Sequence, residues 1–344
     1  MNSSLRWALR IVGALAAALL VAVGAGWFAT RGRYEVPGTV TDDPTLPSVP
    51  LNGVKLHVLT YGDPASPPVI VVHGGPGLDS RHLLPIAALQ DRYFVVFYDQ
   101  RGSGLSERVP DARLTLDAFY ADLDAVVDRY GAGRRVRIVG HSWGAMLASG
   151  YLGLHPEKVS QVVLAEPGML TSDTARLLMA ATHDMSPRPG LAAARLAARV
   201  LLESLHVDGP DADARRDFLV GGLMFAPFDG HPTAGYYCDG DIRTAVLPFW
   251  RAGARVPRAL FAAARDRDGT WRVDFAHGVA RFPGKVLFLA GSCDAVIGEA
   301  MQRRHMALFP RTELVIIPGA GHTMFGEKPD ESLAAVRRYF AEAG

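Results

Sequence analysis

Three residues whose side chains can together cleave a carbonyl compound each lie in a short glycine-containing segment. Ser142 is the central residue of Gly-His-Ser-Trp-Gly, Asp294 ends Gly-Ser-Cys-Asp, and His322 ends Gly-Ala-Gly-His. Serine, histidine and aspartate can act as nucleophile, general base and orienting acid. The residue types therefore predict hydrolysis through a covalent acyl intermediate.

The segment around Ser142 joins a predicted strand at 135–139 to a predicted helix at 145–154. Glycine on both sides allows a tight turn, which projects the serine hydroxyl from the end of the sheet. The helix N-terminus then favours negative charge at that hydroxyl. The five-residue pattern is weak on its own, and its position between strand and helix predicts a nucleophile.

Asp294 and His322 follow two later apolar runs, 285–290 and 313–317, which we predict to be strands. In a parallel sheet the carboxyl ends of the strands meet at one edge, so both side chains are expected near Ser142. We expect His322 to accept the Ser142 proton and Asp294 to fix the imidazole tautomer. A lone histidine or a turn aspartate is usually structural, but the shared order and strand-end positions argue against coincidence.

A second glycine cluster, His-Gly-Gly-Pro-Gly at 73–77, follows the predicted strand 67–72. An oxyanion hole needs backbone N–H groups that side chains do not obstruct, and its second donor follows the nucleophile. We therefore predict Gly75 and Trp143 as the two donors. The alternative is a plain glycine turn.

Taken together, five motifs carry a family resemblance: HGGPG, DQRGSG, GHSWG, a GxxD acid turn and GAGH. The set resembles the prolyl aminopeptidase (proline iminopeptidase) branch of the α/β-hydrolase fold and covers about residues 50–344. The resemblance implies a metal-free serine peptidase that removes an N-terminal residue, typically proline, from short peptides. By similarity, the catalytic triad and the oxyanion hole are the residues named above.

One departure concerns the substrate. Members of that branch resemble one another in cap-domain glutamates, one commonly in a Trp-Glu pair, that bind the substrate ammonium. This chain has no Trp-Glu pair, and Glu203 is the single glutamate of the cap region. A buried ammonium without a carboxylate partner is costly, so an aminopeptidase needs another acid facing the site. The candidates are Glu203, Glu166 and the aspartates Asp208, Asp211, Asp213, Asp229, Asp239 and Asp241.

Glu166 ends the predicted strand 161–165, which lies next to the strand before Ser142. Some α/β-hydrolases place the triad acid after this strand. We prefer Asp294 because its turn matches the family pattern, which leaves Glu166 as an ammonium binder or a polar residue at the cap junction. Tyr236, Tyr237 and Trp250 are further candidates for substrate binding, although aromatic residues in a cap often serve packing alone.

Strands alternate with helices at both ends of the chain, which predicts an α/β class with a mostly parallel, doubly wound sheet. Between the sixth and seventh strands the alternation gives way to helical patterns such as 191–205 and 257–265, which we interpret as a helical cap over the site. Charged residues Asp99 and Arg101 are expected to form a structural ion pair. The predicted units are an N-terminal segment 1–34, a linker 35–50, a core of 51–167 with 284–344, and a cap 168–283.

The N-terminal segment contains twenty uncharged residues, 11–30, with arginines on both sides. At about 1.5 Å per residue this run spans about 30 Å, which is enough for a bilayer. A cleaved signal peptide is the alternative, with small residues at 23–25, and the length favours an uncleaved anchor. Under either interpretation the catalytic domain lies outside the cytoplasm. An uncleaved anchor attaches the chain to the membrane, and a cleaved signal peptide leaves a secreted protein.

The composition of the chain limits the classes of partner and cofactor that we expect it to bind. The net charge is +1, from 36 basic and 35 acidic residues, which argues against a nucleic-acid surface. No HExxH or CxxC motif occurs, so neither a metal nor another cofactor is expected. Cys238 and Cys293 are the two cysteines, and they either form a disulfide between cap and acid turn or remain free thiols. The oligomeric state is not predicted.

Three functions remain open at this stage. The first is an exported or anchored serine aminopeptidase acting on short peptides. The second is a carboxylesterase or lipase-like hydrolase whose apolar cap admits acyl esters. The third is a non-catalytic binding scaffold, against which the complete set of catalytic residues argues. A carboxylate facing the site favours peptides, and an apolar pocket favours esters.

Overall fold

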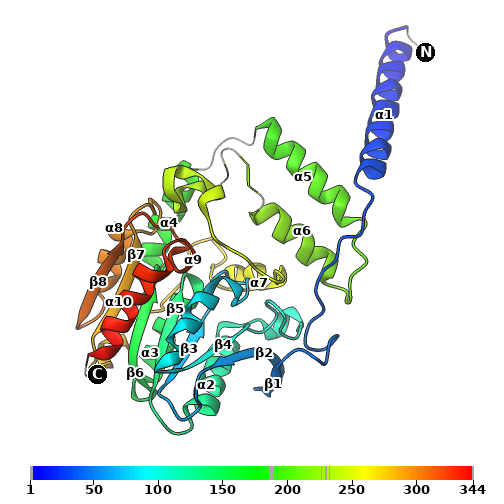
Figure 1. Ribbon diagram of the computed structural model, residues 1–344. Helices are drawn as coiled ribbons and strands as arrows, with labels where there is room; N and C mark the ends of the chain where they lie inside the picture. Colours follow the sequence, from blue (N-terminus) through cyan, green and yellow to red (C-terminus); the bar gives the residue numbers. More distant parts are fainter. Residues whose placement is uncertain (1–2, 186–189, 226, 229–230, 232, 343–344) are drawn as a thin grey trace.

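A single eight-stranded sheet organises the computed structural model, which describes residues 3–185, 190–225, 227–228, 231 and 233–342 (Figure 1). The strand order is β1-β2-β4-β3-β5-β6-β7-β8, with antiparallel pairing from β1 to β4 and parallel pairing beyond. The strands are β1 Ser48–Leu51, β2 Val54–Tyr61, β3 Pro68–Val72, β4 Phe94–Tyr98, β5 Val136–His141, β6 Val159–Ala165, β7 Val286–Gly291 and β8 Thr312–Ile317. This is the mostly parallel sheet that the sequence predicts.

The central strands are apolar along their whole length because helices cover both faces of the sheet. In β3, Ile70 and Val72 pack on one face, and Val69 and Val71 on the other. The first face is covered by α2 Leu116–Gly131, α3 Trp143–Leu154 and α8 Glu299–Met306, and the second by η1 Arg81–Asp91, α9 Met324–Glu327 and α10 Pro329–Ala341. The sheet is therefore a rigid platform whose carboxyl edge carries the turns described below.

The chain between β6 and β7 forms the cap. Its longer helices are α4 Ser172–Met185, α5 Leu191–Ser204, α6 Ala214–Phe225 and α7 Arg255–Ala263. The 3-10 turns along the chain are η2 Asp111–Arg113, η3 Pro156–Lys158, η4 Ala234–Tyr236, η5 Cys238–Gly240, η6 Ile242–Thr244 and η7 Val279–Arg281. Helices α5 and α7 fall on the two helical patterns that the sequence predicts for this region.

The N-terminal segment is one long helix, α1 Ser3–Ala29, which extends away from the body (Figure 1). The residues that follow, predicted to be a linker, are packed on the core over part of their length. Thr39 and Val40 are buried, and the Val40 N–H donates to the Leu105 carbonyl. The end of this segment enters β1. The hydrogen bond at Val40 already fixes the chain to the core before that strand begins.

The expected ion pair between Asp99 and Arg101 is wrong. Arg101 instead donates to both carboxylate oxygens of Asp122 on α2. Asp99 lies 3.0 Å from the His57 imidazole and accepts hydrogen bonds from Ser80. Since each charge is buried, each needs its own polar partners, and different elements supply them.

Candidate functional site

Ser142 occupies a strained turn between β5 and α3. Its φ and ψ are 54° and −120°, a region that residues with a side chain rarely adopt. The turn is held by a hydrogen bond of 2.8 Å from the Ser142 N–H to the Ala165 carbonyl. Gly144 is needed because a Cβ there would lie 2.0 Å from the Val72 carbonyl oxygen. The geometry is that of the nucleophile elbow predicted from the sequence.

His322 lies on the turn after β8 and is held from the cap. Its backbone N–H donates to the Tyr236 carbonyl at 2.8 Å. Its ring lies between two aromatic neighbours, with centroid distances of 4.7 Å to His141 and 5.0 Å to Tyr236. The cap main chain thus contributes to the position of the predicted base.

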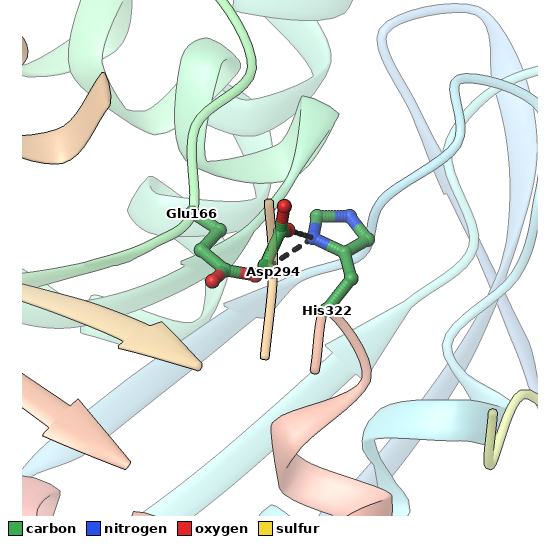
Figure 2. Close-up of side chains that lie close together, drawn as sticks. All are labelled: Glu166, Asp294 and His322. Carbon is green, nitrogen blue, oxygen red and sulfur yellow. Dashed lines mark hydrogen bonds and ion pairs between the residues drawn. The ribbon is translucent and has the colours of Figure 1, made fainter. Parts of the chain in front are cut away.

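Two acids, from neighbouring strands, converge on the same nitrogen of His322 (Figure 2). Glu166 Oε2 lies 2.8 Å from Nδ1, and Asp294 Oδ2 lies 3.4 Å from it. The second oxygen of Glu166 accepts from Gly291 N–H at 2.7 Å. Asp294 Oδ1 accepts from two backbone N–H groups of its own turn at 2.8 Å each. The structure therefore brings together both acids that the sequence left as alternatives.

The charges in this cluster affect one another. Burial and the Asp294 charge raise the pKa of Glu166 well above its usual range. Burial opposes the charged form of His322, but the hydrogen bonds and charges of Asp294 and Glu166 outweigh it and raise its pKa. A general base must begin as neutral imidazole. Protonation of Glu166 removes one of the negative charges that raise the pKa of His322, so it favours the neutral imidazole that a base needs.

Glu166, Asp294 and His322 also have the residue types of a metal site, and their ligand atoms lie within 4.8 Å of one another. Hydrogen bonds already account for this arrangement. Glu166 bridges His322 and Gly291, while Asp294 is fixed by the N–H groups of its turn. We therefore interpret Glu166 and Asp294 as acids that position His322 and bind a proton beside it, and not as metal ligands.

The predicted oxyanion donors lie next to Ser142. Gly75 has a φ of 125°, and a Cβ there would lie 2.7 Å from the backbone nitrogens of Gly77 and Leu78, so this position requires glycine. Gly75 and Trp143 both line the cavity that contains Ser142. The structure thus places the two predicted donors at the nucleophile, and their role in stabilising an oxyanion remains a prediction.

The cavity over Ser142 has a volume of about 340 Å³ and lies between the cap and the carboxyl edge of the sheet. Tyr236 and Tyr237 line it, as the sequence predicts. Most of its other walls are apolar and come from both core and cap; they include Leu78, Met146, Met169, Leu178, Met179, Val220, Met224, Phe225, Leu247, Phe261, Trp271 and Ile297.

Two other predicted substrate-binding residues do not line this cavity. Trp250 lies apart from it, with its ring 5.4 Å from the ring of His57. Its backbone N–H donates to the buried Asp79, and Ala252 and Gly253 of the same loop line the cavity in its place. Glu166 lies 2.8 Å from His322 Nδ1 and does not line the cavity, so the structure places it beside the predicted base.

Comparison with known proteins decides the family. Residues 67–329 match the family described as alpha/beta hydrolase fold. The chain belongs to this family. A relative, epoxide hydrolase A of Mycobacterium tuberculosis, is 31% identical over 86% of this chain and 97% of its own length. A proline iminopeptidase of Xylella fastidiosa is 28% identical over 83% of this chain and 93% of its own.

Solved structures agree with this α/β-hydrolase assignment. A proline iminopeptidase-related protein from Thermus thermophilus has a TM-score of 0.61 at 22% identity, covering 86% of this chain and 96% of its own. At that level of identity the likeness shows the fold. The resemblance to the proline iminopeptidase branch and the predicted fold class are thus both confirmed.

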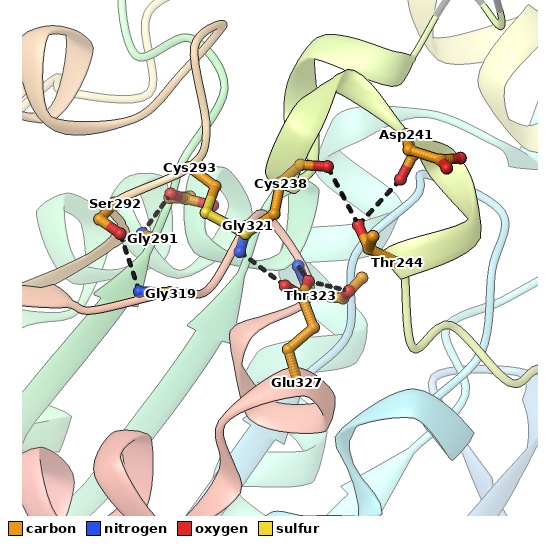
Figure 3. Close-up of a disulfide and its surroundings, with 11 residues drawn as sticks. Cys238, Asp241, Thr244, Gly291, Ser292, Cys293, Gly319, Gly321, Thr323 and Glu327 are labelled. Carbon is orange, nitrogen blue, oxygen red and sulfur yellow. Dashed lines mark hydrogen bonds between the residues drawn. A yellow bond between two sulfur atoms is a disulfide. The ribbon is translucent and has the colours of Figure 1, made fainter. Parts of the chain in front are cut away.

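The cap of this α/β-hydrolase is fastened to both catalytic turns. Cys238 and Cys293 form a disulfide with Cα atoms 4.7 Å apart (Figure 3). The Ala295 N–H donates to the Gly235 carbonyl, next to the Tyr236 carbonyl that holds His322. The sequence left this disulfide as one of two alternatives, and it did not indicate that one short cap segment holds both turns.

Removal of the disulfide is expected to cost stability and activity. The bridge closes a sequence separation of 55 residues, for which chain entropy gives about 4 kcal/mol. We expect the Cys238→Ser/Cys293→Ser variant to unfold at lower urea and to lose kcat, since the Asp294 turn loses a tether. Reductant should lower wild-type stability and leave the variant unchanged. Equal urea midpoints and equal kcat for the two proteins would contradict the prediction.

Two histidines next to the site, His82 and His141, were not predicted from the sequence. His82 Nε2 lies 3.3 Å from His141 Nδ1, and His141 Nε2 lies 2.7 Å from the His322 carbonyl oxygen. Burial lowers the pKa of both His82 and His141, which keeps them neutral. His141 lies within the Gly-His-Ser-Trp-Gly motif and was open to recognition there, whereas His82 has no sequence signal.

Proposed function

We propose that this protein is a serine hydrolase that acts on acyl esters with an apolar acyl group. Ser142 Oγ attacks the ester carbonyl carbon while His322 Nε2 accepts its proton. The Gly75 and Trp143 N–H groups stabilise the oxyanion. The alkoxide leaves with the proton from Nε2, and water then hydrolyses the acyl-enzyme by the same steps.

The observation that carries this proposal is the chemistry of the cavity walls. Among the described residues that line the cavity, none is an aspartate or a glutamate. Arg265 contributes a positive charge instead, with its guanidinium 4.3 Å from the centroid of the Trp271 ring. A cationic wall and a lack of carboxylates disfavour a substrate with a free ammonium. Apolar walls favour an uncharged acyl group.

The described cap acids that could bind a substrate ammonium are either exposed away from the cavity or paired with an arginine. Asp208 and Asp239 are exposed and do not line the cavity, and Asp229 lies outside the described residues. The other four each pair with an arginine: Glu203 with Arg199 at 2.7 Å, Asp211 with Arg251 at 2.7 Å, Asp213 with Arg216 at 2.9 Å and Asp241 with Arg243 at 2.8 Å. The lack of a described carboxylate at the cavity supports ester substrates over substrates that carry an N-terminal amine.

Prolyl aminopeptidase activity is the second candidate. Proline iminopeptidases are among the relatives, at 28% identity over most of both chains. The HGGPG and DQRG motifs of this chain also resemble that branch. An active-site carboxylate from a residue outside the described set would supply the missing ammonium partner.

Epoxide hydrolysis, named for the relative at 31% identity, conflicts with the nucleophile of this chain. A serine hydroxyl that opened an epoxide ring would form an ether, and a histidine-activated water does not cleave ethers. A carboxylate nucleophile would form an ester, which water does cleave. Ser142 therefore supports a carbonyl substrate, from which it forms a hydrolysable ester.

A panel of four substrates tests the proposal. We expect turnover of p-nitrophenyl butyrate, with kcat/KM at least about a hundredfold above that of proline-naphthylamide. N-blocked proline-naphthylamide and styrene oxide should show no turnover. Cleavage of proline-naphthylamide at a rate equal to or above that of the ester would replace this proposal with the aminopeptidase. Ester hydrolysis that persists in Ser142→Ala would place the reaction elsewhere.

A further inference from the structure

The cap carries an exposed apolar stripe that neither the core nor the catalytic site uses. Along α5, residues Leu191, Ala194, Ala198, Leu201 and Leu205 recur at helical spacing and share one face, here called the α5 stripe. Its leucines are 67%, 51% and 43% exposed, in chain order. The buried face of α5, which includes Val200, is a different one and packs against α6 at Gly222.

Helix α1 ends against this part of the cap. Leu202 packs on Gly26, where an added Cβ would lie 2.8 Å from its Cδ1. His206, just beyond α5, approaches the Trp27 carbonyl oxygen at 3.1 Å through Nε2. Tyr34 contacts Phe218 of α6, with ring centroids 5.5 Å apart. The base of α1 is therefore fixed to the two cap helices that carry or support the α5 stripe.

The residues of α1 have the pattern of a membrane-crossing helix. The most apolar 18 residues of the span Ser4–Ala29 have a mean hydropathy of 2.2, and none of them is buried. Trp27 and Tyr34 lie at its base together with Arg31, whose guanidinium lies 4.6 Å from the Trp27 ring centroid. Aromatic and arginine side chains are typical of the membrane interface. If α1 crosses a bilayer, its contact with α5 lies at that interface.

The α5 stripe also has the flanking charges of an interfacial helix. Arg195 and Arg199 are exposed and lie beside the stripe on α5. An apolar face next to arginines is the pattern of helices that lie in the headgroup region. Figure 1 shows α5 on the side of the body from which α1 extends, so both elements face the same surface.

Helix α6, which packs against α5 at Gly222, contributes residues to the cavity that contains Ser142. Met224, at the end of α6, is 45% exposed and also lines the cavity that contains Ser142. Val220 and Phe225 of the same helix line the cavity as well. The cap helix beside α5 therefore forms part of the cavity mouth.

We propose that the α5 stripe rests in the surface of the bilayer that α1 crosses, and that acyl esters dissolved in that bilayer enter the cavity past Met224. The entry of esters past Met224 rests on the proposed esterase function. The contact of the α5 stripe with the bilayer depends on this surface alone. The occupant of the stripe is the lipid bilayer, in preference to a second copy of the chain or another protein.

Photo-cross-linking of the full-length protein in phosphatidylcholine vesicles tests the surface. A benzophenone-bearing residue in place of Leu201 should form cross-links to lipid. The same residue in place of Leu154, an exposed leucine at the carboxyl end of α3 in another part of the body from α1 and α5 (Figure 1), should form none. Cross-links from position 201 to a second copy of the chain, or no lipid cross-links, would overturn the proposal. So would a membrane-isolated protein whose N-terminus begins at Gly26.

Ester hydrolysis tests the route. We expect Leu201→Asp to lower hydrolysis of 4-methylumbelliferyl decanoate embedded in the vesicles at least about tenfold and to keep hydrolysis of soluble p-nitrophenyl butyrate within twofold. Leu154→Asp should leave both rates unchanged. Equal effects of the two variants on the embedded ester would overturn the route and leave the esterase in place. If the wild-type protein hydrolyses neither ester, the proposed esterase function is wrong. Lipid cross-links from position 201 would still support the contact between the α5 stripe and the bilayer.

Discussion

Replacement of Ser142 by alanine is expected to lower kcat for ester hydrolysis by about 10⁶-fold. The strained turn places this side chain in the cavity that the predicted oxyanion donors and His322 also line. Because nucleophile and base act as a unit, His322→Ala should cost about as much, and the double variant should lose little more. Single-turnover and steady-state kinetics on p-nitrophenyl butyrate measure these losses.

Ser149 provides the matched control for this experiment. It lies two turns further along α3, is buried, and donates to the Phe275 carbonyl at 2.7 Å. Ser149→Ala removes one buried hydrogen bond, worth about 1 kcal/mol of stability, and should leave kcat within about twofold. A fluorophosphonate should label the wild type and Ser149→Ala, each once at Ser142. Labelling of Ser142→Ala, or a loss of kcat below a hundredfold in that variant, would contradict the assigned nucleophile.

The parts of the site that the sequence predicts are those fixed by local geometry. The Ser142 turn needs glycines on both sides and a strand before it, and these requirements are visible in consecutive residues. His322 and Asp294 were found because each follows an apolar strand, and parallel strands end at one edge of the sheet. Two cap helices, α5 and α7, follow from periodicity, whereas the sequence analysis named no helix at α4 or α6.

The choice between two acids was not open to such reasoning. β6 and β7 are adjacent parallel strands with Ala165 paired to Leu289, so Glu166 and the Asp294 turn reach the same point. Differences below 1 Å decide which oxygen bonds to Nδ1, and these depend on packing across the sheet. Trp250 was mispredicted for a similar reason, since the buried Asp79, distant in sequence, fixes its loop. Aromatic type alone does not indicate which wall a residue joins.

The two acids of His322 are expected to be partly interchangeable. With Glu166 protonated, Asp294 carries the charge that stabilises the imidazolium, and glutamine imitates the neutral Glu166. We therefore expect Glu166→Gln to keep kcat within about tenfold. Burial and the Asp294 charge both raise the Glu166 pKa, and Asp294→Asn removes the second cause, so we expect Glu166 to ionise more readily and to stabilise the imidazolium in place of Asp294. That variant should lose about 10- to 100-fold.

The double variant Glu166→Gln/Asp294→Asn has no charge left on the Nδ1 side, and it should lose about 10⁴-fold, as a triad without its acid does. The loss then exceeds the product of the single losses, which is the mark of two groups serving one role. Glu327→Gln is the matched control, because Glu327 accepts from Gly321 N–H on the His322 turn and does not contact Nδ1. Its kcat should change less than about threefold. If Asp294→Asn alone equals the double variant, Glu166 does not replace the charge, and if Glu166→Gln alone equals it, Glu166 is the charged acid and Asp294 the neutral one.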